Sequence, residues 1–252
     1  MIRCMNVDMI VTEKAIRRLL TPYQDAKRKT HDAGYIPSAL AHDGCNLPGI
    51  RTVTKHIEHE LKKTPWNNQR ALLNSIWKIS NNFAVLYVLL LLVDGRKKTL
   101  DLADWRVLKT WSKKIDNWAH SDVLSTIFAS LLDTFPDELY PTLQKWNTSK
   151  LPWERRLSLV SLLCYARSRT NPLPYEKISA LVEPRIHDEH FYVQRAVGWT
   201  LREAYVLYPT KTKKFVKDHL KDFSSIAFTT AIEKYSAKEK ETFKSLRKKL
   251  RA

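Results

Sequence analysis

The sequence predicts an all-helical fold of short helical hairpins, similar to HEAT repeats, stacked into a curved solenoid. Only five Gly occur in 252 residues, which disfavours sheets built on tight hairpin turns and Gly-rich phosphate loops. Apolar residues recur every three or four positions through most of the chain, as amphipathic helices require. Prolines sit near the starts of several of these segments, where first-turn prolines are tolerated: Pro65, Pro136, Pro152, Pro174 and Pro209.

The elements follow from this periodicity between the proline marks. The longest apolar run, FAVLYVLLLLV at 83–93, is too short to span a bilayer and indicates a buried helix. The predicted helices are 9–30, 50–62, 66–80, 83–93, 101–114, 117–133, 137–147, 153–168, 175–183, 190–207, 210–220, 226–235 and 237–250. No segment has the alternation of a strand.

Paired helices recur roughly every 35 to 40 residues, near the period of helical-hairpin repeats. We expect one domain with an amino-terminal helical adapter at 1–47, repeats at 48–235 and a basic helix at 236–252. The repeats differ in sequence, so a compact irregular helical domain is the alternative. A solenoid would present a concave groove suited to a rod-like ligand.

The formal charge of +17 and a pI near 9.8 favour a polyanionic partner, most often nucleic acid. Residues 209–252 hold 13 Lys and Arg against 5 Asp and Glu, so this segment is either a solvated end cap or a contact to phosphates. An anionic membrane surface is a weaker alternative, since no basic amphipathic helix with an exposed aromatic edge stands out.

Three widely spaced cysteines, Cys4, Cys45 and Cys164, form neither a disulfide framework nor a zinc pattern. No signal sequence precedes a cleavage site. A reduced, cytoplasmic setting therefore fits. We also expect a monomer that does not bind membranes. In two pairs of histidines the members are three residues apart: His56 with His59, and His187 with His190. Neither pair has a third ligand at a recognised distance, so we predict no metal site.

Three Trp-centred segments are candidates for a site. In KIDNWAHSDVLS at 114–125, Trp118 and Asp122 are four residues apart and share one helical face. PWERRLSLV at 152–160 begins an apolar helix with Arg155 and Arg156. In FYVQRAVGWTLREA at 191–204, a Gly directly precedes Trp199.

Each Trp taken alone fits core packing better than a site. A Gly inside a helix costs about 1 kcal/mol relative to Ala. Gly198 therefore indicates the close approach of another backbone or of a ligand, and helix packing explains it equally well. The serines Ser121 and Ser158 have no paired base in the local sequence, so a nucleophilic triad is not supported.

Together, the three segments resemble the motifs of the AlkD-like DNA alkylation repair family, helical-repeat glycosylases that remove alkylated purines from DNA. IDNWAHSD is similar to the family's Trp-x-x-x-Asp segment, PWERRLSLV to its Arg-bearing helix, and FYVQRAVGWTLREA to its most specific motif. The resemblance extends from about Gly49 to about Tyr235. The stretch 43–49 lacks the Gln or His that the family carries near its amino terminus.

The resemblance implies that Asp122 is the catalytic carboxylate and that Trp118 and Trp199 flank the sugar. It makes Arg156 the match to the family's essential Arg, with Arg155 as the second choice. The implied substrate is duplex DNA with 3- or 7-alkylated purines, and no cofactor is expected. The basic residues that we expect to contact DNA are Arg155, Arg195, Arg202, Lys211, Lys213 and Lys214.

The chemistry suits these residue types. An alkylated purine is already cationic, so its glycosidic bond needs no strong general acid. An ionised carboxylate can stabilise the developing sugar cation and position water. No single Lys is marked out for a Schiff base, so we expect no lyase activity. The alternatives are a non-catalytic binder of damaged or branched DNA on the same scaffold, and a protein-interaction scaffold, which would leave the charge unexplained.

Overall fold

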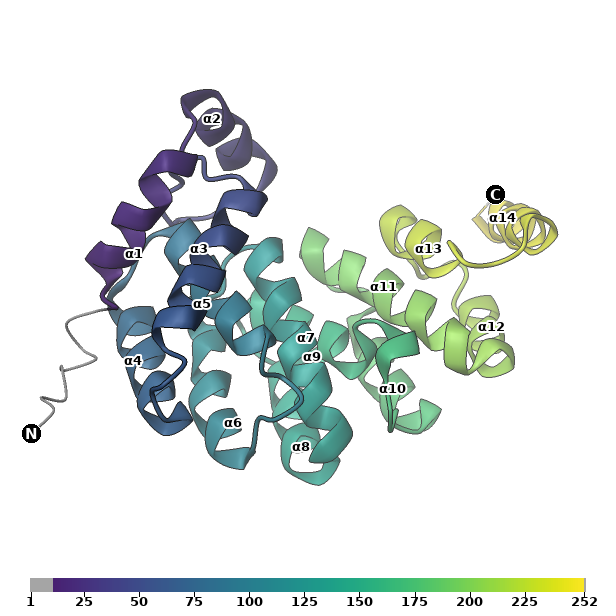
Figure 1. The fold of residues 1–252 in the computed structure, drawn as a ribbon. Coiled ribbons are helices and arrows are strands. Elements are labelled where there is room, and N and C mark those ends of the chain that lie inside the picture. The colour runs from purple at the N-terminus through teal and green to yellow at the C-terminus, as the bar shows by residue number, and fades with distance from the viewer. Residues whose placement is uncertain (1–10, 252) are drawn as a thin grey trace, which may run out of the picture. The chain divides into compact units, whose positions relative to one another are not determined.

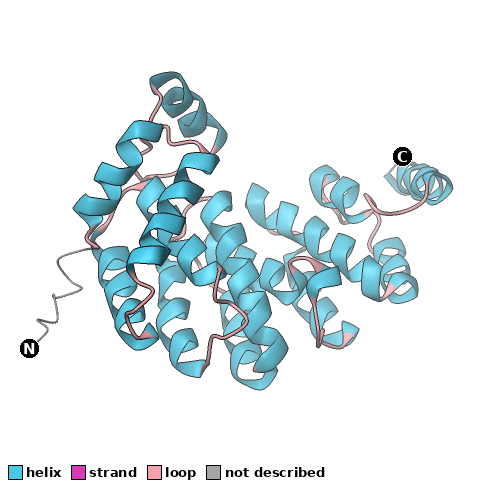
Figure 2. Ribbon diagram, viewed as in Figure 1, coloured by secondary structure: helices cyan, strands magenta, loops and turns pink. Residues whose placement is uncertain are grey.

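The computed structural model describes residues 11–251, and their regular elements are all helices (Figures 1 and 2). Cys4 and the first residues of the predicted helix 9–30 lie outside this range. The only β pairing in the described residues is an isolated bridge between Ala41 and Asn82. None of the described helices is both long and apolar enough to cross a membrane. The predicted all-helical fold is confirmed.

The chain divides into two compact units, one ending at Val123 and the other beginning at Leu124. The first unit holds α1 (Glu13–Leu20), η2 (Thr21–Tyr23), α2 (Ala26–Tyr35), α3 (Leu47–Glu60), α4 (Trp66–Ile79), α5 (Phe83–Asp94), α6 (Leu102–Leu108), η3 (Lys109–Lys114) and the start of α7 (Trp118–Thr134). The second unit holds the rest of α7 with α8 (Pro136–Asn147), α9 (Pro152–Leu163), η4 (Ala166–Ser168), α10 (Tyr175–Val182), η5 (Glu183–Arg185), α11 (Phe191–Leu207), α12 (Pro209–Asp218), α13 (Ser225–Ala231) and α14 (Ala237–Arg251).

The helix α5 is the core of the first unit. It is apolar on all sides and packs against α1, α3 and α4, as a helix without a polar face must. Trp77 and Trp111 stack in parallel with ring centroids 4.2 Å apart. In the second unit α11 is central and packs against α9, α12 and α13, while α8 packs against α9.

Side-chain caps set many helix starts. In each case a side-chain oxygen accepts a hydrogen bond from a backbone N–H in the first turn, which contributes about 1 kcal/mol. The capping residues are Thr12, Asp25, Asn46, Asn82, Asp101 and Ser224. Asp101 and Asp104 form a reciprocal capping box at α6.

The predicted helix 9–30 is wrong as one element, because the chain forms α1 and α2 with a 3₁₀ turn between them. Pro22 opens that turn, since it lacks an N–H, and Asp25 then caps α2. The predicted helix 153–168 ends five residues early, at Leu163, because Cys164 adopts a positive φ of 49°. The stacking of hairpins into a curved solenoid with a basic groove stays a prediction.

Candidate active site

A buried polar cluster fixes the start of α7 immediately before Trp118. Asn117 Oδ1 accepts the backbone N–H of His120 at 2.9 Å, and Asn117 Nδ2 donates to Asp116 at 3.0 Å. The Asp116 carboxylate in turn accepts Ser38 Oγ–H and Ala39 N–H, each at 2.6 Å. The first turn of α7 is thereby tied to the loop that follows α2.

His120 is fully buried in this cluster and is a neutral base. Its Nδ1 accepts from Asn117 Nδ2 at 3.0 Å, and its Nε2–H donates to the Phe83 carbonyl at 3.1 Å. The ring stacks on Phe83 with centroids 4.4 Å apart. Burial lowers the pKa of His120 to about 4, although the Phe83 carbonyl opposes the shift.

This shift makes the stability of the first unit dependent on pH. Because the pKa of His120 is lower in the folded protein than in the unfolded chain, the unfolded chain binds the proton more readily at pH values between these two pKa values. The free energy of unfolding therefore falls as pH falls. We expect His120 to remove about 2 kcal/mol of unfolding free energy between pH 6.5 and 5. Urea unfolding at both pH values measures this loss.

The matched control is His59→Gln, at an exposed histidine of α3. That variant should keep the full loss on acidification, whereas His120→Gln should be less stable at neutral pH and lose less on acidification. Equal acid losses in wild type and His120→Gln would show that His120 is not the titrating group.

Trp118 is held by its indole N–H while its ring stays half-exposed. Trp118 Nε1 donates to the Tyr35 carbonyl at 3.2 Å, and the two rings meet edge to face at 5.5 Å. Tyr35 is 62% exposed, and its ring centroid lies 5.6 Å from that of His31 on α2. Asp122 follows one turn later on α7 and is half-buried. Sequence reasoning missed Tyr35, because its contact with Trp118 spans 83 residues and leaves no local pattern.

Trp199 is held in the same way in the second unit. Its Nε1 donates to the Cys164 carbonyl at 2.8 Å, and Tyr165, which is 56% exposed, lies 5.9 Å from it between ring centroids. The guanidinium carbons of Arg156 and Arg202 lie 6.0 Å and 5.3 Å from the Trp199 ring. The second unit therefore brings Arg156 and Trp199 together, with two cations at one indole.

The main chain is strained at Cys164, whose carbonyl accepts the indole N–H of Trp199. Cys164 is 3% exposed and has a positive φ of 49°, a conformation that costs a non-Gly residue on the order of 1 kcal/mol. The turn ends α9, presents the Cys164 carbonyl to Trp199 and leaves Tyr165 exposed. In the sequence, Cys164 stood out only as one of three widely spaced cysteines.

Gly198 serves helix packing. A Cβ at this position would lie 2.6 Å from the Ala227 carbonyl oxygen and 2.7 Å from Thr230 Cβ, both on α13. The close approach that the sequence predicted is therefore that of α13 to α11, and of the two explanations left open the structure supports packing.

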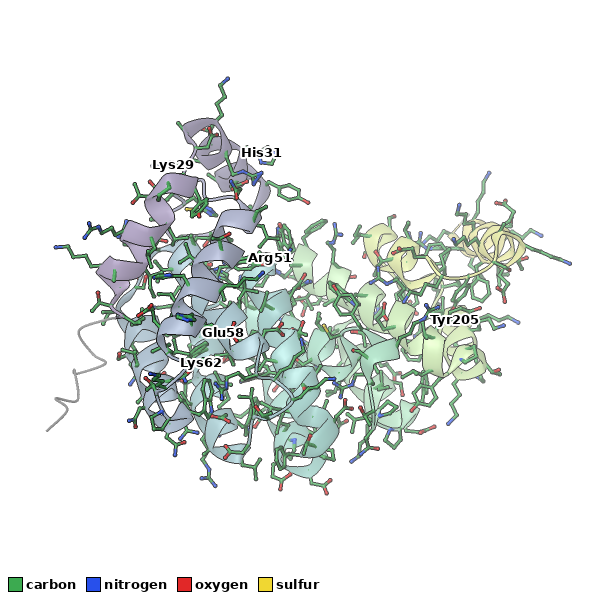
Figure 3. The ribbon with its side chains drawn as sticks, viewed as in Figure 1. Lys29, His31, Arg51, Glu58, Lys62 and Tyr205 are labelled. Carbon is green, nitrogen blue, oxygen red and sulfur yellow. The ribbon has the colours of Figure 1, made fainter. Side chains whose placement is uncertain are left out.

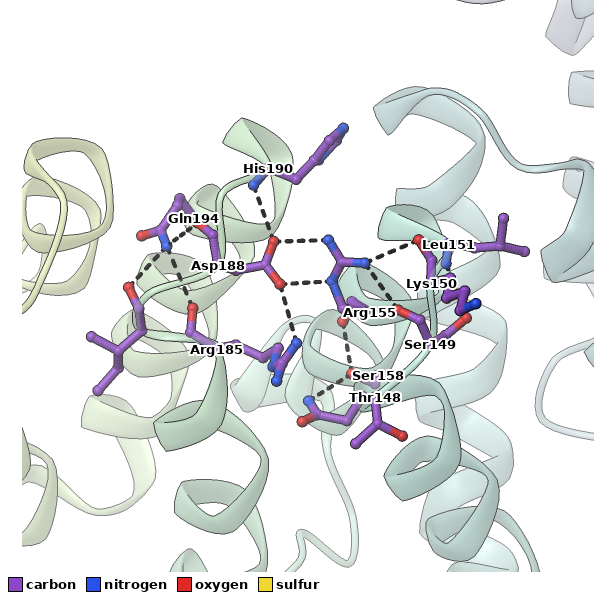
Figure 4. A network of polar contacts seen from close by, with 12 residues as sticks. Thr148, Ser149, Lys150, Leu151, Arg155, Ser158, Arg185, Asp188, His190 and Gln194 are labelled. Atoms are coloured by element: carbon purple, nitrogen blue, oxygen red, sulfur yellow. Dashed lines mark hydrogen bonds and ion pairs between the residues drawn. The ribbon is translucent and has the colours of Figure 1, made fainter.

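Arg156 and Arg155 differ in their surroundings. Arg156 is 3% exposed, and its Nη1 donates to the Tyr192 carbonyl at 2.8 Å. Arg155 forms a bidentate pair with Asp188, at 2.6 Å and 3.0 Å, and donates to the carbonyls of Ser149 and Lys150 (Figure 4). Arg155 is thus engaged within the protein, and its expected contact with DNA stays a prediction.

Asp188 joins the start of α9 to the start of α11. Its carboxylate also accepts from Arg185 at 3.3 Å and from the His190 N–H at 3.1 Å, and its carbonyl accepts Gln194 Nε2 at 2.6 Å (Figure 4). Burial alone would raise the pKa of Asp188, but the hydrogen bonds from Arg155 and His190 outweigh it and lower the pKa. The two helices that carry Arg156 and Trp199 are fixed to each other by this ionised group.

Comparison with known proteins decides the family. Residues 16–235 match the sequence profile of the DNA alkylation repair enzymes. The chain belongs to this family. A predicted DNA alkylation repair enzyme from Enterococcus faecalis has the same fold, with a TM-score of 0.72 and 18% identity over 85% of this chain and 97% of that one. The protein smu.31 from Streptococcus mutans UA159 gives a TM-score of 0.50 at 18% identity, over 79% and 96%. No curated protein matches the chain significantly.

Membership confirms the resemblance found in the sequence and supports a role in DNA repair, with DNA as the partner.

The five other residues expected to contact DNA occupy different settings. Arg195 is exposed beside Phe191, and Arg202 is paired with Glu203 and Glu233. The three lysines of α12 each contact an acid: Lys211 with Glu176, Lys213 with Glu239 and Lys214 with Asp218. Within residues 11–251 no group of three His, Cys, Asp or Glu side chains could hold a metal.

Proposed function

We propose that this family member is a monofunctional DNA glycosylase acting as a monomer on duplex DNA. It hydrolyses the N-glycosidic bond of 3- or 7-alkylated purines and leaves an abasic site. One observation carries the proposal: Trp118 and Trp199 are held in the same way. Each donates its indole N–H to a backbone carbonyl, stays half-exposed and has an exposed tyrosine beside it. Indoles fixed in this way suit contact with a sugar.

The reaction needs little from the protein beyond charge and position. The bond between the sugar C1′ and N9 of the purine breaks, and the cationic base, alkylated at N3 or N7, leaves as a neutral molecule with the bonding electrons. The electron-rich faces of Trp118 and Trp199 would attract the sugar as it becomes positive. The Asp122 carboxylate would stabilise that charge and take a proton from the water that attacks C1′. Arg156 would hold an adjacent phosphate or orient Asp122.

The test is release of free base. We expect the protein to release 7-methylguanine from a duplex that contains it, and to leave an abasic strand that breaks only on later treatment with alkali. Chromatography of the free base and a denaturing gel of the strand measure the two products. Binding with no release over hours would support the non-catalytic binder instead. Strand breakage without alkali would show lyase activity and contradict the monofunctional assignment.

A further inference from the structure

The helix α14 is anchored to the rest of the second unit by arginines. Arg247 donates to the carbonyls of Leu220 and Phe223, at 3.1 Å and 2.6 Å. Arg251 donates to the carbonyls of Lys221, at 2.8 Å, and Phe223, at 2.7 Å. These carbonyls follow the end of α12. A capping box of Ser236 and Glu239 fixes the other end of the helix. The helix α14 is therefore fixed at both ends to the rest of the second unit and is not a solvated extension.

Three lysines form a line along this anchored helix. Lys240, Lys244 and Lys248 are spaced four residues apart, so they follow one side of α14, and we call them the basic stripe. Lys244 and Lys248 are exposed, and Lys240 is half-exposed. Nitrogen-tipped side chains project from α14 away from the ribbon (Figure 3).

The stripe lysines differ from Lys211, Lys213 and Lys214 of α12 in having no ion-pair partner. Within residues 11–251, no ion pair with a distance of 4.0 Å or less joins an acidic side chain to the ammonium group of Lys240, Lys244 or Lys248. All three lysines that we first expected to bind DNA from α12 do have such an acid, as described above. An unpaired ammonium can exchange its counterion for a phosphate without first breaking an ion pair, so the stripe is the better phosphate contact.

We propose that the basic stripe binds the phosphate backbone of duplex DNA independently of damage. The stripe covers about 12 Å of helix, and a duplex presents about seven phosphates over that length. The inference rests on the proposed function in taking duplex DNA as the partner, but it does not require base hydrolysis. The stripe then supplies general affinity for DNA and leaves recognition of the alkylated purine to other residues.

The surroundings favour DNA over an anionic membrane. A helix that lies on a bilayer buries its apolar face in the lipid. Here the apolar face of α14 is partly used inside the protein, since Phe243 packs against Tyr235 with ring centroids 5.3 Å apart. The guanidinium of Arg247 is likewise turned inward, 4.6 Å from the Phe228 ring. The charged side chains of the basic stripe lie beside this face, and of the apolar residues of α14 Leu250 stays open to solvent, at 52% exposed.

The test compares two triple variants on undamaged duplex DNA. One is Lys240→Gln/Lys244→Gln/Lys248→Gln, and the other replaces the paired lysines, Lys211→Gln/Lys213→Gln/Lys214→Gln. Both remove three charges from the same segment. Each phosphate contact adds about 0.9 to the slope of log affinity against log salt. We therefore expect the stripe variant to lower that slope by about 2 to 3, and the α12 variant to lower it by less.

Fluorescence anisotropy at several salt concentrations measures the slopes, and circular dichroism checks that both variants are folded. An unchanged slope for the stripe variant, or a larger drop for the α12 variant, would overturn the inference. A loss of affinity that is confined to duplex DNA containing 7-methylguanine would also overturn it. So would a stripe variant that no longer binds phosphatidylserine vesicles, which the wild type binds, but keeps the wild-type salt slope on DNA. Undamaged DNA is used so that failure of base release would leave this result unaffected.

Discussion

Asp122→Asn should lower the rate of 7-methylguanine release by at least about 100-fold, the usual cost of removing one preorganised electrostatic group from a transition state. The amide has nearly the same shape as the carboxylate, so the first turns of α7 should be kept. It carries no negative charge, however, and cannot stabilise a sugar cation or accept a proton from water. Single-turnover kinetics with saturating protein separates this loss from a loss of binding, which should change by only a few-fold.

The matched control for Asp122 is Asp137→Asn, at an exposed acid in the first turn of α8. It removes the same charge from the same protein and should leave release within about two-fold of wild type, since an exposed charge is well screened by solvent. If Asp122→Asn keeps release within a few-fold, or if both variants lose it equally, Asp122 is not the catalytic carboxylate.

The parts of this site that the sequence could predict are those encoded within one helix. The period of apolar residues predicted α7, and four-residue spacing placed Trp118 and Asp122 one turn apart. The break between α1 and α2 was also predictable, because Pro22 and the capping Asp25 both lie inside the segment 9–30 that is predicted as one helix. Those two residues are helix-stop and helix-start signals.

The rest depends on contacts between distant segments. Nothing near Tyr35 indicates that its carbonyl accepts the indole N–H of Trp118, and nothing near Cys164 indicates a positive φ. The same holds for charge. Composition showed a basic segment at 209–252 but not which lysines are paired, since Lys211 meets an acid 35 residues away. A count of charges therefore predicts a polyanionic partner without locating the surface that binds it.

Asp188→Ala should lower the unfolding free energy by about 3 to 5 kcal/mol, as expected when one partner of a buried ion pair is removed. The side chains of Asp188 and Arg155 are 3% and 15% exposed, so Ala would leave the Arg155 guanidinium without its counterion in a poorly hydrated place. The His190 N–H would also lose its acceptor. Urea unfolding at pH 7 measures the change. The control Asp218→Ala breaks the exposed pair with Lys214 and should have no measurable effect.

Two further measurements separate the ion pair from simple packing. Because the pKa of Asp188 is lowered in the folded protein, its contribution is present above the ordinary pKa of an aspartate and is lost as pH falls through the folded value. Asp188→Asn should therefore show less of the acid-induced loss than wild type does. The double variant Arg155→Met/Asp188→Leu, which removes both charges and keeps the volume, should recover most of the stability. If the double variant is no more stable than Asp188→Ala, the unpaired Arg155 charge does not cause the loss of stability. The loss would then come from the other hydrogen bonds of Asp188.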